Sequence, residues 1–333
     1  MKNFTCACGQ ALFFENSRCL NCDHQVGFDP VDLQMRRLDD NGDSSRPLCQ
    51  NSADYGVCNW LVSEAGDRYC LACKLNHTIP NLKLPQRRSW WKSMEHAKRR
   101  LIYSLLSLQL PIEGKDQNPD GLAFEFIEDQ RTNPGVVEEH VNTGHLNGLI
   151  TINIAEADHV RREINRQFTG ELYRTLLGHF RHEIGHYYFN KLVACDADKR
   201  EAFRELFGDE QRDYGAALEY YYNNKFTLEL DPNLISHYAQ AHPLEDWAEV
   251  WAHYLHMVDT LETAGEYNMQ QGSTHFDDID DLMLKWSELT IMLNALNRSM
   301  GLEDAYPFTL STLTMAKLRF VHGLIYPSSW PRS

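Results

Sequence analysis

The most constraining feature of the chain is the stretch 182–186, with the sequence HEIGH, inside a helical pattern that runs from Tyr173 to Val193. A spacing of four residues places the imidazoles of His182 and His186 on one face of an α-helix, one turn apart. Two imidazoles arranged in this way can share one Zn²⁺ at about 2.0–2.1 Å each. Glu183 leaves the same turn at a different angle, so we expect it to act as a general base on a water and not as a ligand.

A catalytic zinc needs a third protein ligand, and a second helical pattern offers two carboxylates. Pro243 suits the first turn of a helix, which then carries Glu245 and Glu249 on one face, four residues apart. The apolar residues around them, including Trp247 and Trp251, argue against a solvated acidic face. A buried carboxylate needs a partner such as a metal. One glutamate can therefore bind zinc, while the other accepts the free ring N–H of a ligand histidine.

Eight of the nine cysteines fall into two sets within the first 73 residues. The first set is Cys6, Cys8, Cys19 and Cys22, and the second is Cys49, Cys58, Cys70 and Cys73. Each set can wrap one metal in a tetrahedral shell, which would contribute folding energy where the chain is too short to bury much core. We expect two structural zinc ions, although rubredoxin-like iron would use the same ligands. Sequential pairing closes shorter loops than a cross-braced arrangement, which the spacing also allows.

The motif and its downstream glutamates resemble the gluzincin metallopeptidases, a group that includes thermolysin and anthrax lethal factor. The resemblance implies that His182, His186 and Glu245 hold the catalytic zinc and that Glu249 orients a histidine. In lethal factor a tyrosine stands seven residues before the ligand glutamate, as Tyr238 stands before Glu245 in this chain. We therefore expect Tyr238 to donate a hydrogen bond to the developing oxyanion.

From the paired cysteines through "GHFRHEIGHYY" to "EDWAEVWAHYLH", the chain resembles the bacterial zinc-binding metallopeptidases that contain a zinc ribbon. This resemblance implies an α+β, mainly helical fold, in which a zincin-like catalytic domain follows a small cysteine-rich zinc-ribbon region. We expect two zinc-ribbon-like units of four cysteines each in residues 1–80 and the catalytic domain in residues 81–333. The implied activity is zinc-dependent hydrolysis of a peptide or protein substrate, with Glu183 as the general base.

Composition narrows the possible partners and the location. A net charge of −15 and a pI near 5.4 would repel phosphate backbones, so we expect no nucleic-acid partner. No apolar run approaches 18 residues, and the first residues lack the apolar segment of a secretory leader, so we expect a cytoplasmic protein without a membrane span. A rival hypothesis is a protein-binding module, in which the ribbons dock a protein partner and the zincin body is an inactive or regulatory scaffold.

Three further stretches bear on the fold. The pattern predicts a helix from Ser89 to Leu108, with a basic run at residues 98–100 for which we expect carboxylate partners or solvent instead of a phosphate ligand. Residues 122–127 and 148–154 read as strands. The second of these precedes the HEIGH helix, where the resemblance to zincins implies a strand that pairs with substrate backbone. An internal strand is the alternative.

Overall fold

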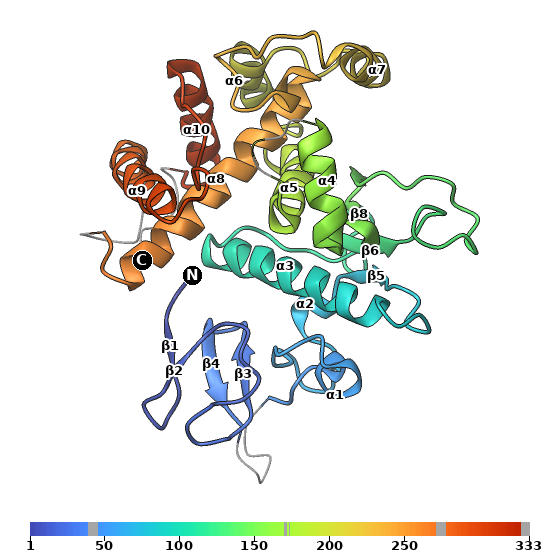
Figure 1. Ribbon diagram of the computed structural model, residues 1–333, viewed down its shortest axis with the longest axis vertical. Coiled ribbons are helices and arrows are strands. Elements are labelled where there is room, and N and C mark those ends of the chain that lie inside the picture. Colours follow the sequence, from blue (N-terminus) through green and yellow to red (C-terminus); the bar gives the residue numbers. More distant parts are fainter. Residues whose placement is uncertain (39–45, 170–171, 173, 271–277, 328–333) are drawn as a thin grey trace. The chain divides into compact units, whose positions relative to one another are not determined.

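The computed structural model describes residues 1–38, 46–169, 172, 174–270 and 278–327, and helices dominate it. The chain forms two compact units (Figure 1). The N-terminal unit contains residues 2–169 and 174–180, and the C-terminal unit contains Met1 and the described residues from Arg181 onward. The predicted fold class is confirmed, since the chain is α+β and mainly helical with a cysteine-rich region in the first 80 residues.

The N-terminal unit opens with two antiparallel hairpins and two short helices. The hairpins pair β1 with β2 and β3 with β4. These elements are β1 (Phe4–Thr5), β2 (Ala11–Leu12), β3 (Val26–Asp29), β4 (Gln34–Arg37), α1 (Gln50–Tyr55) and α2 (Leu71–Lys74). The strands and helices are short, but they enclose a small aromatic core in which Phe14 and Phe28 lie 4.8 Å apart and Phe28 and Trp60 lie 4.9 Å apart, measured between ring centroids.

A four-stranded sheet forms the rest of the β structure in the described residues. Its order is β5 (Asn76–Thr78), β6 (Ala123–Ile127), β8 (Leu149–Asn153) and β7 (Gly144–Leu146). β6 pairs in parallel with both β5 and β8, whereas β7 is antiparallel to β8. β8 therefore has a neighbour on each side. Of the two interpretations of residues 148–154, the structure supports the internal strand.

Helix α3 (Arg87–Ser107) lies against this sheet (Figure 1). A buried cation, Lys98, contributes to the contact. The ammonium of Lys98 lies 2.9 Å from the carboxylate of Glu95, and Asn76 of β5 donates to the same carboxylate at 2.7 Å. Lys98 also lies 5.7 and 5.6 Å from the ring centroids of Phe124 and Phe126 in β6. Lys98 and Glu95 are both fully buried, so each depends on the other to offset the loss of hydration.

The other two members of the basic run point elsewhere, because successive helical residues are rotated by about 100°. Arg99 is buried and donates to the carbonyl of Val57 at 2.5 Å. Arg100 donates at 2.8 Å to the carboxylate of Glu15, which lies between Cys8 and Cys19 in the sequence. The expectation of carboxylate partners is confirmed for Lys98 and Arg100. The run does not form a solvated face, because Lys98 and Arg99 are buried.

The remaining elements lead into the helical C-terminal unit. They are η1 (Ile154–Ala157), α4 (His159–Thr169), α5 (Leu176–Leu192), α6 (Ala197–Phe207), α7 (Tyr214–Asn224), η2 (Tyr238–Gln240), α8 (Pro243–Glu266), α9 (Ile279–Ser299) and α10 (Thr312–Ile325). The HEIGH stretch lies in α5 as predicted, while the expected start at Tyr173 falls outside the described residues.

Helix α8 is the centre of the C-terminal unit, where it contacts α6, α9 and α10 (Figure 1). Trp247 and Trp251 are completely buried, and Lys317 of α10 forms a buried ion pair with Asp246 at 2.5 Å. Pro243 occupies the first turn, as predicted. Within the described part of the chain, none of the helices combines the length and hydrophobicity of a transmembrane span.

We predict that Lys98→Met lowers the free energy of unfolding by about 3–5 kcal/mol, because it leaves the Glu95 carboxylate buried without a cation. Urea unfolding followed by tryptophan fluorescence would measure the change. Lys92→Met is the matched control, since Lys92 is exposed on the same helix. Adding Glu95→Gln to Lys98→Met should recover much of the loss. If the free energy of unfolding of Lys98→Met alone lay within about 0.5 kcal/mol of the wild-type value, this account of the network would be wrong.

Candidate metal sites

Helices α5 and α8 approach each other closely at Gly185. A Cβ atom added there would lie 3.0 Å from the Cα of Ala248 and 3.2 Å from the Cβ of Trp251. The indole N–H of Trp247 donates to the carbonyl of Gly185 at 2.8 Å. Because Gly185 has no side chain, the backbones of the two helices can approach each other closely at this point. This approach brings the face of α5 that carries the histidines against the face of α8 that carries the glutamates.

The donor atoms of His182, His186 and Glu245 all lie within 4.8 Å of one another. Nε2 of His182 is 2.9 Å from one oxygen of Glu245, and Nε2 of His186 is 3.6 Å from the other. Tetrahedral zinc with bonds of about 2.0–2.2 Å requires separations of about 3.2–3.6 Å between such donors. The donor set, two imidazoles and one carboxylate, fits a zinc site after shifts of a few tenths of an ångström.

The second glutamate of α8, Glu249, contacts His182 at the ring nitrogen that does not face Glu245. Nδ1 of His182 donates to Glu249 at 2.7 Å, so Nε2, which faces Glu245, is the nitrogen that could exchange its proton for a metal. Burial disfavours a charged His182, but hydrogen bonds to Glu245 and Glu249 outweigh burial and raise its pKa well above the usual range. Burial likewise raises the pKa of Glu245, yet His186 and His182 hold it well below normal. The cluster therefore attracts positive charge, which a metal ion would also supply.

Glu183 and Tyr238 lie beside these groups. Glu183 is buried, and burial raises its pKa even though His182 and His186 act in the opposite direction. The ring of Tyr238, in η2, lies 5.8 Å from the ring of His182. Burial also raises the pKa of Tyr238 well above its usual value, so its hydroxyl keeps its proton and can act as a donor.

A further tyrosine joins this cluster, and no sequence pattern points to it. Tyr214, the first residue of α7, donates its hydroxyl hydrogen to Glu245 at 2.5 Å. Tyr222 of the same helix lies 6.4 Å from Tyr238, measured between ring centroids. Helix α7 thus lines the cluster together with α5 and α8.

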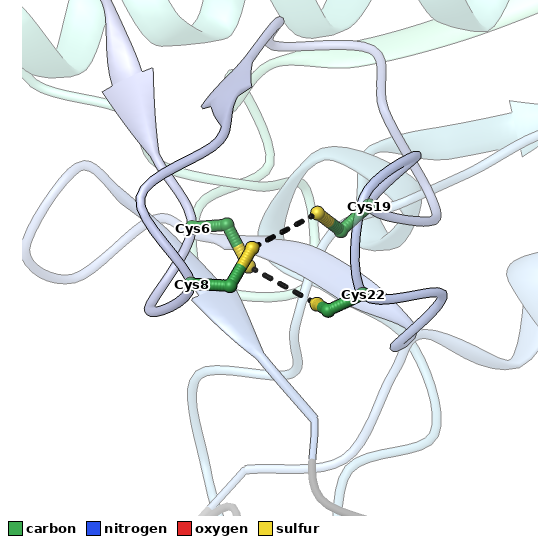
Figure 2. Close-up of side chains that lie close together, drawn as sticks. All are labelled: Cys6, Cys8, Cys19 and Cys22. Atoms are coloured by element: carbon green, nitrogen blue, oxygen red, sulfur yellow. Dashed lines mark hydrogen bonds between the residues drawn. The ribbon is translucent and has the colours of Figure 1, made fainter.

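The cysteines gather in the two sequential sets and not in the cross-braced alternative. Figure 2 shows the first set with its four side chains turned toward a common centre, where the sulfur atoms of Cys6 and Cys22 are 3.7 Å apart and those of Cys8 and Cys19 are 3.6 Å apart. In the second set the sulfurs of Cys58 and Cys70 are 3.7 Å apart. Tetrahedral zinc with bonds of about 2.3 Å gives a separation of about 3.8 Å, whereas a disulfide bond is about 2.05 Å long. Both sets fit a metal.

The two sets differ in their surroundings. All four cysteines of the second set are buried, whereas Cys8 is exposed and Cys22 is partly exposed in the first. Four thiolates and one Zn²⁺ carry a net charge of about −2, which is unfavourable in a buried site without a nearby cation. Arg99 meets that need: burial lowers its pKa, but Cys58 and other anionic neighbours outweigh burial and keep it charged.

Comparison with known proteins gives a consistent assignment. A family model described as "Putative zinc-binding metallo-peptidase" matches residues 87–324, and a zinc-ribbon domain model matches residues 3–84. Relatives described as uncharacterized proteins occur in Mycobacterium bovis and in two strains of Mycobacterium tuberculosis. Each is 42% identical over 335 residues, which cover 98% of this chain and 95% of the relative. No solved structure matches the chain.

The geometry and the comparisons point the same way. One helix pair gathers two histidines and a glutamate, and two cysteine sets have the spacing of metal sites. The family model spans more than half of the chain, and the relatives span nearly all of it. The protein therefore belongs to the family described as "Putative zinc-binding metallo-peptidase" and carries a zinc-ribbon domain at residues 3–84.

Proposed function

We propose that the protein is a zinc-dependent peptidase of gluzincin type. His182, His186 and Glu245 would hold the catalytic zinc, and the observation that carries this proposal is their convergence within 4.8 Å from two helices. Zinc bound there would polarise the carbonyl of the scissile bond and lower the pKa of a water toward about 7.

The other residues of the cluster supply the proton transfers and the orientation. Glu183 would take a proton from the attacking water and deliver it to the leaving amine. Its burial suits this role, because a raised pKa brings a carboxylate closer to neutral pH. Tyr238 would donate a hydrogen bond to the carbonyl oxygen as negative charge develops there. Glu249 would keep His182 in the tautomer that presents Nε2.

The two cysteine sets would hold one structural zinc ion each. Residues 1–80 would then be the ribbon region and residues 81–333 the catalytic region. This division follows the two kinds of metal site, and it differs from the two compact units described above. Eight cysteines kept as thiols in metal-like groups suit a reducing compartment, so we place the protein in the cytoplasm. A protein partner that binds through the ribbons is compatible with this arrangement.

The first prediction separates an enzyme from a scaffold. Glu183→Gln should keep the fold and the zinc content but lose turnover by at least about 100-fold, because it removes the base. Cleavage of an unbiased peptide library, with elemental analysis of each variant, is the measurement. Tyr238→Phe should lower turnover by about 10–1,000-fold.

Glu288→Gln, an exposed change of the same kind on α9, is the control and should match wild type. A parallel complementation assay in cells that lack the protein tests the biological role. Full complementation by Glu183→Gln would defeat the peptidase proposal and favour a protein-binding ribbon module on an inactive scaffold.

The second prediction concerns the third ligand. Glu245→Ala should abolish zinc binding at the catalytic site, since it removes one of three donors. Glu249→Ala should weaken that binding by about 10–100-fold without abolishing it, as loss of a ligand's supporting hydrogen bond does. Zinc per chain and competition with a chelator give both values. The reverse order would show that Glu249 is the ligand.

The third prediction concerns the metal count. Elemental analysis should find three zinc ions per chain. A chelator should remove the zinc of the first cysteine set, which contains exposed Cys8, faster than the zinc of the fully buried second set. Cys22→Ser should lose one zinc, whereas Cys195→Ser should lose none, because the exposed Cys195 belongs to neither set. One zinc per chain with eight titratable thiols would refute the ribbon assignment.

A further inference from the structure

The hydroxyl of Tyr214 makes a short hydrogen bond to one of the three candidate ligands. It donates to Glu245 at 2.5 Å, within the range of a strong hydrogen bond to a carboxylate. Glu245 is completely buried, whereas 43% of the surface of Tyr214 is exposed. The peptidase mechanism proposed above has no role for this tyrosine.

A buried ligand carboxylate has more acceptor capacity than a metal can satisfy. Each oxygen has two lone pairs, and a zinc ion engages one or two of the four positions. One oxygen of Glu245 faces Nε2 of His182 at 2.9 Å, and the other faces both Nε2 of His186 at 3.6 Å and the hydroxyl of Tyr214. A donor on the outer side of that second oxygen would fix the carboxylate plane without occupying the space between the histidines.

Contacts of α7 with neighbouring segments hold Tyr214 in place. Its ring makes an edge contact with His242 at 5.1 Å, and His242 caps the first turn of α8 by accepting from the amide of Leu244. Further along α7, Tyr221 bonds to Nδ1 of His237 at 2.8 Å and packs on Tyr238 at 5.5 Å. Helix α7 is thus held at both the start of α8 and η2, the two segments that carry Glu245 and Tyr238.

We propose that Tyr214 is a positioning residue of the metal site, whose hydroxyl holds Glu245 in its ligating orientation. The inference rests on the proposed assignment of zinc to His182, His186 and Glu245, but not on cleavage of peptides. It divides the work of two tyrosines: Tyr214 acts on the ligand carboxylate, while Tyr238 faces the reacting carbonyl.

The test removes only the hydroxyl. Tyr214→Phe in the full chain should weaken zinc binding at this site by about 10–100-fold in competition with a chelator, while both cysteine sets keep their zinc. Tyr220→Phe is the matched control, because Tyr220 lies on the same helix and is 62% exposed. It should bind zinc as wild type does. Urea unfolding midpoints would show that both variants fold.

The outcomes separate the two proposals. If Tyr214 acts only through its ring against His242, the phenylalanine variant will bind zinc like wild type, and the inference is wrong. If wild type holds the third zinc but cleaves no peptide, the peptidase proposal fails, while weaker zinc binding by Tyr214→Phe still supports the inference. If wild type holds zinc only at its cysteines, the metal assignment and the role of Tyr214 are both overturned.

Discussion

The candidate site depends on the close approach of α5 and α8 at Gly185. Because an added Cβ would meet the backbone of Ala248 at 3.0 Å, a side chain at this position would push the helices apart. Ligand geometry tolerates displacements of only a few tenths of an ångström. Gly185, which offers no ligand atom, is therefore the residue that allows the histidines of α5 to meet Glu245 of α8, and the hydrogen bond from Trp247 to the Gly185 carbonyl maintains the contact.

Charge balance explains why a cation belongs at this contact. Burial raises the pKa of Glu183, and the negative charges of Glu245 and Glu249 raise it further, while His182 and His186 lower it. Two positive charges from a zinc ion would balance Glu245 and Glu249 and leave Glu183 available as a base. The neighbouring carboxylate of Asp246 faces away and is neutralised by Lys317 instead. Burial still raises the pKa of Asp246 to about 6, despite Lys317.

The features that the sequence could predict are those that depend on residues close together along the chain. Local periodicity placed His182 and His186 on one helix face and Glu245 and Glu249 on another, because a spacing of four determines direction within a helix. The sequential cysteine grouping followed from loop length. Tyr214 could not be predicted, since it meets Glu245 across 31 residues through the tertiary placement of a separate helix. The parallel pairing of β5 with β6 across α3 was equally invisible in so short a strand.

The run at residues 98–100 has a consequence for how this architecture can be inherited. Lys98 is buried against the sheet, Arg99 lies by the second cysteine set, and Arg100 donates to Glu15, between two cysteines of the first set. Three successive residues of α3 thus contact the sheet and the regions of both cysteine sets. Exchange of the cysteine-rich region would take the Val57 carbonyl from buried Arg99 and the Glu15 carboxylate from Arg100. A different cysteine-rich region would have to supply the same two acceptors to α3, and the mycobacterial relatives match this chain along almost their entire length.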